Sequence, residues 1–141
     1  MIEAGLGLLN LLWSRPYRVV DMYPEKADKD LAAIQHWVTA GAMVISVGVI
    51  GWLLPLILFF TNQSKFVKFH ALQSLLAQVG FLVVGTVLLI AGPFTCLISW
   101  GLLGILWFGL LAFHIIAGLQ AKEGKIYEIP VVGSMAKNML P

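Results

Sequence analysis

Three histidines are the side chains of this sequence that could do chemistry inside a membrane, where ionisable residues commonly serve function. We place His36 near one membrane face, His70 near the other, and His114 about 12 Å inside the membrane from Lys122. A haem or chlorophyll-type ligand role needs imidazoles at similar depth, and His70 with His114 is the pair that could provide them. The alternative to a ligand role is a structural one, in which a neutral imidazole forms a hydrogen bond with a backbone carbonyl or with Gln73. We predict no bound cofactor.

Residue patterns typical of catalysis or metal binding are absent from the sequence. The long charge-free runs hold no acidic residue, and there is no Cys/His metal spacing, no Ser-His-Asp set and no glycine-rich phosphate loop. Cys96 is the single cysteine, so an intrachain disulfide is excluded. We therefore predict a non-enzymatic protein with no catalytic residue and no metal site.

The positions of these histidines depend on two runs without Asp, Glu, Lys or Arg, at residues 31–64 and 69–121. Helices of soluble proteins carry a charged face, which runs of this length lack. The chain is 60% hydrophobic and 11% charged, with a mean hydropathy of +0.91. These values indicate an integral membrane protein. The net charge of +2 is too small to indicate a nucleic-acid partner.

Three membrane-spanning helices fit the two runs. The first run is too short for two crossings, and we expect Pro55 to kink its helix. The second run would extend about 80 Å as one helix, and Gly92-Pro93 is the turn signal that divides it. The predicted fold is an all-α, three-helix integral membrane bundle over residues 31–121, with spans at about 31–60, 71–91 and 95–119.

The two ends of the chain are assigned to the membrane surface. Residues 1–13 are apolar but too short to cross a bilayer, so we expect an interfacial helix or a contact with a partner. They belong to an N-terminal segment, 1–30, that continues as a charged linker. Residues 122–141 form a C-terminal surface segment, and Gly124 is predicted to end the last helix.

Two groups of residues are assigned to lipid contact and to helix packing. Aromatic and basic side chains at the ends of spans favour the membrane interface; these are Trp37, Lys65, Phe66, Lys68, Phe69, Trp100, Lys122 and Lys125. Small or polar residues within spans favour close helix contact; these are Gly41, Gly48, Gly51, Pro55, Gln73 and Gln78.

The count of three spans also fixes the predicted topology. The N-terminus and the Gly92-Pro93 hairpin lie on one face, together with Trp37 and Trp100. The Lys65/Lys68 loop and the C-terminus lie on the other face, which the positive charges assign to the cytoplasm or its organellar equivalent.

Four short motifs occur in an order that resembles a known family. They are Asp30 to His36 (DLAAIQH), Pro55 to Leu58 (PLIL), Lys65 to Gln73 (KFVKFHALQ) and Ala121 to Pro130 (AKEGKIYEIP). Over residues 28–132 the chain resembles the small multispanning Tic subunit of chloroplast protein import and its short prokaryotic relatives of unknown function. The resemblance implies a multispanning fold and a link to protein translocation. The plastid protein has four spans, whereas three are predicted here.

Three functional classes follow. The first is a structural or accessory subunit that packs within a larger membrane complex. The second, implied by the resemblance, is a translocon-like or channel-forming component. The third is a haem- or pigment-carrying subunit. We expect membrane lipids, other membrane protein subunits or further copies of the chain as partners, in a bacterial inner membrane or an organellar inner membrane.

Overall fold

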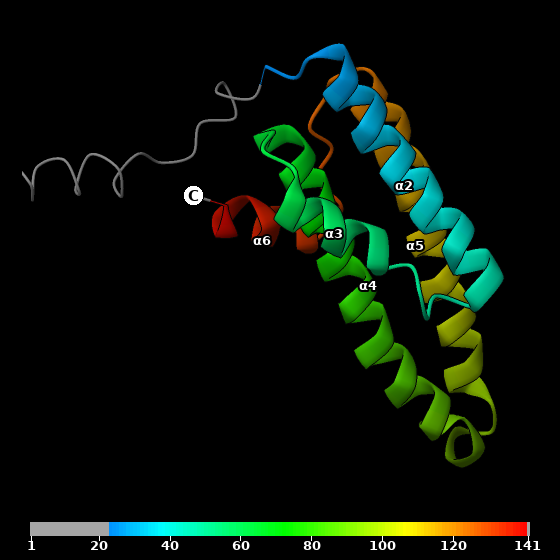
Figure 1. The fold of residues 1–141 in the computed structure, drawn as a ribbon. Coiled ribbons are helices and arrows are strands. Elements are labelled where there is room, and N and C mark those ends of the chain that lie inside the picture. Colours follow the sequence, from blue (N-terminus) through cyan, green and yellow to red (C-terminus); the bar gives the residue numbers. More distant parts are fainter. Residues whose placement is uncertain (1–22, 141) are drawn as a thin grey trace, which may run out of the picture.

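The computed structural model describes residues 23–140, and within this range all regular structure is helical (Figure 1). The predicted N-terminal interfacial helix lies outside the described residues. The elements are α2 (Lys26–Ser46), α3 (Leu53–Thr61), α4 (Lys65–Ala91), the 3₁₀ turn η2 (Gly92–Thr95), α5 (Ile98–Lys122) and α6 (Val132–Met139).

Helices α4 and α5 form a long antiparallel hairpin closed by η2, so the predicted break at Gly92-Pro93 is confirmed. The indole Nε1 of Trp100 donates a hydrogen bond to the Leu89 carbonyl at 3.0 Å, which ties the two helices together beside this turn. The segments Lys65–Thr95 and Ile98–Lys122 are the two in the described residues that are long and apolar enough to cross a membrane.

The predicted single helix over residues 31–60 is wrong, because the chain turns back between α2 and α3. At this turn the Ser46 hydroxyl donates to the Ala42 carbonyl and accepts from the Ile50 amide, and Trp52 Nε1 donates to the Val49 carbonyl. These side chains satisfy backbone groups that the broken helix leaves free, as an apolar environment requires. Pro55 lies in the first turn of α3, where no helical bond needs its N–H.

The turn between α2 and α3 stops far from the η2 end of the hairpin. A Cβ on Gly48 would meet the Phe81 ring, and Phe81 lies about 15 Å along α4 before Ala91. Helix α3 then returns along α4. Helices α2, α4 and α5 pack together, but α2 is not one of the two candidate spans, so a bundle of three transmembrane helices is not confirmed.

Helix α2 begins beside the end of α5, as Figure 1 shows. The ammonium of Lys122 lies 5.4 Å from the centre of the Trp37 ring, which fixes this arrangement. The starts of α2 and α4 and the end of α5 therefore share one end of the molecule, which we call the lysine end. The prediction that the first helix starts at the Gly92-Pro93 face is wrong, and Trp37 and Trp100 lie at opposite ends.

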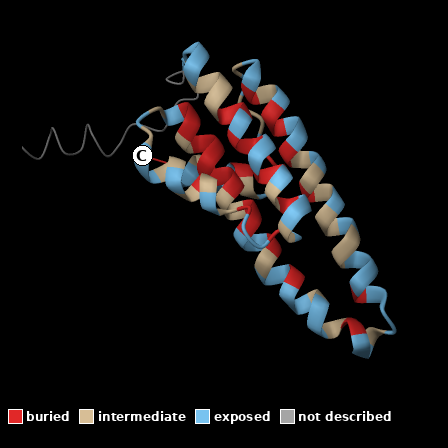
Figure 2. Ribbon diagram, turned by 45° about the vertical axis from the view of Figure 1, so that its right-hand side comes forward, coloured by how far each residue is buried: buried red, intermediate tan, exposed pale blue. Residues whose placement is uncertain are grey.

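The C-terminal segment folds back onto the bundle. The amides of Gly124 and Lys125 donate to the carbonyls of Ala121 and Gln120, both at 2.9 Å, so Gly124 ends α5 as predicted. Helix α6 then packs on α4. Its Ala136, together with Leu140, joins a buried apolar cluster with residues of α2, α4 and α5. Figure 2 shows that buried residues gather in the half of the molecule nearer the lysine end, while the η2 end is largely exposed.

Candidate functional site

The three histidines, which the sequence placed at different depths, meet in the interior. His36 Nε2 lies 3.0 Å from His70 Nδ1, and His36 Nδ1 lies 3.2 Å from His114 Nδ1. All three side chains are fully buried. They come from α2, α4 and α5 respectively, so His36 bridges the two arms of the long hairpin.

Two glutamines and a serine extend this arrangement, which we call the histidine layer (Gln35, His36, His70, Ser74, Gln78 and His114). Gln35 Nε2 donates to Ser74 Oγ at 2.6 Å, and Ser74 Oγ lies 3.1 Å from His36 Nδ1. At the other side, Gln78 Nε2 lies 3.3 Å from His114 Nε2. The layer thus links three helices through polar contacts within an otherwise apolar bundle.

The hydrogen bonds define a direction for the imidazole chain. An amide N–H of Gln78 donates to His114 Nε2, so His114 carries its proton on Nδ1 and donates to His36. His36 then carries its proton on Nε2 and donates to His70 Nδ1. Turning the Gln78 amide over would present its oxygen and reverse the direction, because the tautomers follow the hydrogen-bond network.

The layer also contains polar atoms that the described residues do not satisfy. The side-chain oxygens of Gln35 and Gln78, and the hydroxyl of Thr39 beside the layer, are buried without a hydrogen-bond partner among the described residues. Ordered water commonly serves such groups in proteins. The members of the layer depend on one another, because removal of one would leave further atoms unpaired.

The geometry of the layer does not suit a haem between His70 and His114. Both nitrogens of His36 face other imidazoles, with ring centres 5.1 Å and 5.4 Å away, so His36 occupies the space between the other two rings. Among residues 23–140, no group of three or more His, Cys, Asp or Glu side chains is placed to hold a metal ion.

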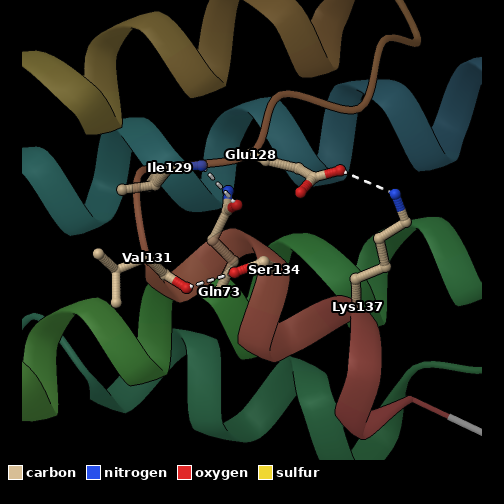
Figure 3. Close-up of polar contacts among 6 residues, drawn as sticks. All are labelled: Gln73, Glu128, Ile129, Val131, Ser134 and Lys137. Carbon is tan, nitrogen blue, oxygen red and sulfur yellow. Dashed lines mark hydrogen bonds and ion pairs between the residues drawn. The ribbon is translucent and has the colours of Figure 1, made fainter.

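Gln73, predicted as a helix-packing residue, holds the C-terminal segment (Figure 3). Its Oε1 accepts a hydrogen bond from the Ile129 amide at 2.9 Å. Next to it, Lys137 of α6 forms an ion pair with Glu128 at 3.0 Å. A Cβ on Gly133 would lie 2.7 Å from Gln73 Oε1, so this approach requires glycine. The segment after α5 is thereby fixed against α4.

The other predicted packing residues differ in their surroundings. Gly48 and Gly51 lie at the α2–α3 turn, and Gly48 has a φ of 93° that favours glycine. A Cβ on Gly51 would lie 2.9 Å from Gln78 Oε1, so this turn packs directly on the histidine layer. Pro55 is buried. Gly41 is exposed and has no atom within 4 Å of a built Cβ, so it makes no close contact.

The predicted interface residues also divide into two groups. Lys65, Lys68, Lys122 and Lys125 lie at the lysine end, three of them exposed and Lys68 half-buried. Phe66 and Phe69 are buried in the apolar cluster under α6, where they pack with Ala136 and Leu140 rather than facing lipid. The predicted Lys65/Lys68 loop is the first part of α4.

The distance of each histidine from the lysine at the end of its helix could have predicted the histidine layer. The prediction of three spans placed α2 in the opposite direction, so these distances were not compared. If α2 and α4 both start at the lysine end, then His36, His70 and His114 lie about 15, 8 and 12 Å from Lys26, Lys65 and Lys122. These depths match closely enough for contact. The contact of His36 with the other two histidines was missed because its helix was predicted to run in the opposite direction.

Comparison with known proteins supports a different family from the one suggested by the short motifs. The magnetosome magnetite crystal formation protein family, MamF/MmsF, matches residues 27–136. The UPF0132 membrane protein MJ1443 of Methanocaldococcus jannaschii is 33% identical over 97 residues, which cover 69% of this chain and 82% of that protein. No solved structure matches. The resemblance to the Tic subunit of chloroplast import is therefore wrong, since its motifs are short and common at membrane edges.

Proposed function

Because this chain belongs to the MamF/MmsF family of magnetosome magnetite crystal formation proteins, we propose that it is a non-enzymatic membrane subunit that helps to build a larger membrane assembly. The family description names magnetite crystal formation, and a subunit of a mineral-forming membrane is one form that this role would take. The described residues support the more general role, that of a subunit in a larger membrane assembly.

The complete burial of the histidine layer is the observation that carries this proposal. An active site or a conducting pore needs its polar groups to face a space that a substrate or an ion can enter. Here both nitrogens of His36 face other imidazoles, and the three histidine side chains have no exposed surface. Such a layer suits a structural role, in which polar contacts join helices within a membrane.

The outer surface of the hairpin is suited to contacts with neighbours in the bilayer. Val87 on α4 and Ile105 on α5 are 62% and 71% exposed. Two grooves of about 710 Å³ and 530 Å³ run along this part of the molecule, and their linings are almost entirely apolar. Such surfaces accept either lipid chains or the helices of other subunits, including a second copy.

The charge distribution supports an orientation for the subunit. Every lysine from Lys26 to Lys125 lies at the lysine end, whereas the η2 end carries no charge in the run from Phe69 to Ala121. We place the lysine end on the cytoplasmic side or its organellar equivalent, since cytoplasmic segments of membrane proteins are rich in lysine and arginine.

Site-specific photo-crosslinking in native membranes tests the subunit role. A photoreactive phenylalanine analogue at Val87 or at Ile105 should give a discrete adduct with one polypeptide, which is another subunit or a second copy. The same analogue at Phe94, in the exposed η2 turn, is the control and should give weaker adducts. Lipid adducts alone at both test positions, with a monomer after mild extraction, would contradict the proposal.

A further inference from the structure

A column of side chains lies between α2 and α5 at the lysine end, apart from the histidine layer. Lys29 and Trp37 share one face of α2, two turns apart. The indole of Trp37 packs against Gly118 of α5, where a larger residue would clash. The Lys122 ammonium, one turn after Gly118, lies 5.4 Å from the centre of that indole.

Lys29 is held in the same column by the end of α5. A Cβ on Gly124 would lie 2.7 Å from Lys29 Cε and 3.2 Å from its Nζ, so the lysine side chain lies directly over this glycine. Gly124 has a φ of 77° as part of the helix end. Lys29 and Lys122 are therefore both directed to the seam between α2 and α5.

Lys29 and Lys122 differ from Lys125 and Lys137, which form ion pairs with carboxylates. Lys125 pairs with Glu123 at 2.6 Å, and Lys137 pairs with Glu128 at 3.0 Å. Within residues 23–140, neither Lys29 nor Lys122 has a carboxylate within 4 Å, although Asp28 and Asp30 flank Lys29 along α2. Among the residues that the structure describes, no carboxylate therefore neutralises these two positive charges.

Exposed aliphatic side chains lie on α2 and α5 near the depth of the indole. Ile34 and Val38 of α2 are 48% and 46% exposed, and Ile115 and Leu119 of α5 are 45% and 53% exposed. From the lysine end, Lys29 and Lys122 come first and the Trp37 indole beside Gly118 lies deeper. Val38 and Ile115 lie beyond the indole. A phospholipid has the complementary sequence of phosphate, glycerol backbone and acyl chain.

We propose that an anionic phospholipid binds at the α2–α5 seam. Lys29 and Lys122 contact its phosphate, the Trp37 indole lies at the level of its glycerol, and an acyl chain covers the aliphatic side chains below. A bound lipid of this kind would link the ends of α2 and α5 independently of any protein partner, so the inference goes beyond the subunit role.

Native mass spectrometry of the full chain in mild detergent tests this site. Phosphatidylglycerol would be added in one series and phosphatidylcholine in another. The variant Lys29→Gln with Lys122→Gln should bind phosphatidylglycerol about tenfold or more weakly, because each lysine near an anionic surface contributes appreciably. The matched control, Lys26→Gln with Lys125→Gln, removes the same charge from the same end and should retain most binding.

A second measurement separates loss of the site from loss of folding. Circular dichroism and gel filtration of both double variants should match the unaltered chain. Trp37→Phe should weaken binding less than the loss of both lysines. The proposal would be overturned if the two double variants lost phosphatidylglycerol binding equally. It would also be overturned if the unaltered chain bound phosphatidylcholine as strongly as phosphatidylglycerol. Either result would indicate a general attraction of lipid to the protein surface.

Discussion

His36 Nε2 and His70 Nδ1 lie 3.0 Å apart, although 34 positions separate these residues in the chain. This contact joins α2 to α4, and the second nitrogen of His36 joins α2 to α5. This single side chain therefore joins α2 to both arms of the hairpin. Its loss should affect the whole bundle, which allows the layer to be tested by stability measurements.

The variant His36→Ala should be strongly destabilised. It leaves His70 Nδ1 and His114 Nδ1 without their imidazole partner, and each unpaired buried group costs about 1–3 kcal/mol. Unfolding in detergent, followed by circular dichroism, measures the change. Val38→Ala, on the exposed face of the same helix, is the control and should change stability by about 0.5 kcal/mol or less.

A double-mutant cycle then asks whether the histidines act as one unit. The double variant His36→Ala with His70→Ala should lose clearly less free energy of unfolding than the sum of the two single variants. The second change removes an atom that the first has already left unpaired. Additive costs would show that these two side chains do not interact, and the proposed layer would be wrong.

The α2–α3 turn should tolerate no side chain at Gly48. Its φ of 93° disfavours an L residue, and a Cβ would lie 2.7 Å from the Phe81 ring. We expect Gly48→Ala to destabilise the protein by about 1–2 kcal/mol or more. Gly41→Ala, within α2 and with open space around its Cβ, should be neutral or stabilising by up to about 1 kcal/mol. Equal effects of the two changes in thermal unfolding would contradict this turn.

These comparisons show which features of the fold could be inferred from composition and turn signals. The charge-free runs predicted apolar helices, and Gly92-Pro93 predicted the hairpin turn, because both signals are local. The α2–α3 turn was missed since it has no charged residue and no proline at its centre. It is stabilised by Ser46 and Trp52, whose hydrogen bonds to the backbone are visible only in the folded chain.

The candidate site was harder to predict because it depends on helix direction. His70 and Gln73 were singled out, but the partner of His70 is His36, and Gln73 contacts Ile129 near the C-terminus. One wrong crossing reverses the depth of every residue in a helix. Local sequence patterns do not indicate the direction in which a helix crosses the membrane, whereas the grouping of lysines at one end of the helices does.

The C-terminal segment should be held mainly by Gln73 rather than by the ion pair of Lys137 with Glu128. Gln73→Leu leaves the buried Ile129 amide without its partner, at about 1–3 kcal/mol. The ion pair is about a third exposed and should contribute roughly 1 kcal/mol or less. Hydrogen exchange should therefore accelerate over residues 125–140 in Gln73→Leu and much less in Lys137→Met. The reverse order would contradict this attachment.

The topology can be tested with the single cysteine of the chain. Cys96 follows η2 and is exposed at the end opposite the lysines. A membrane-impermeant maleimide added outside intact cells should label Cys96, because two crossings by α4 and α5 place η2 across the membrane from the lysine end. In a Cys96→Ser background, Gln63→Cys reports on the exposed loop before α4 and should be labelled only after the cells are opened. Labelling of both positions from the same side would contradict the hairpin, whereas labelling of Gln63→Cys alone from outside would keep the hairpin and reverse the proposed orientation.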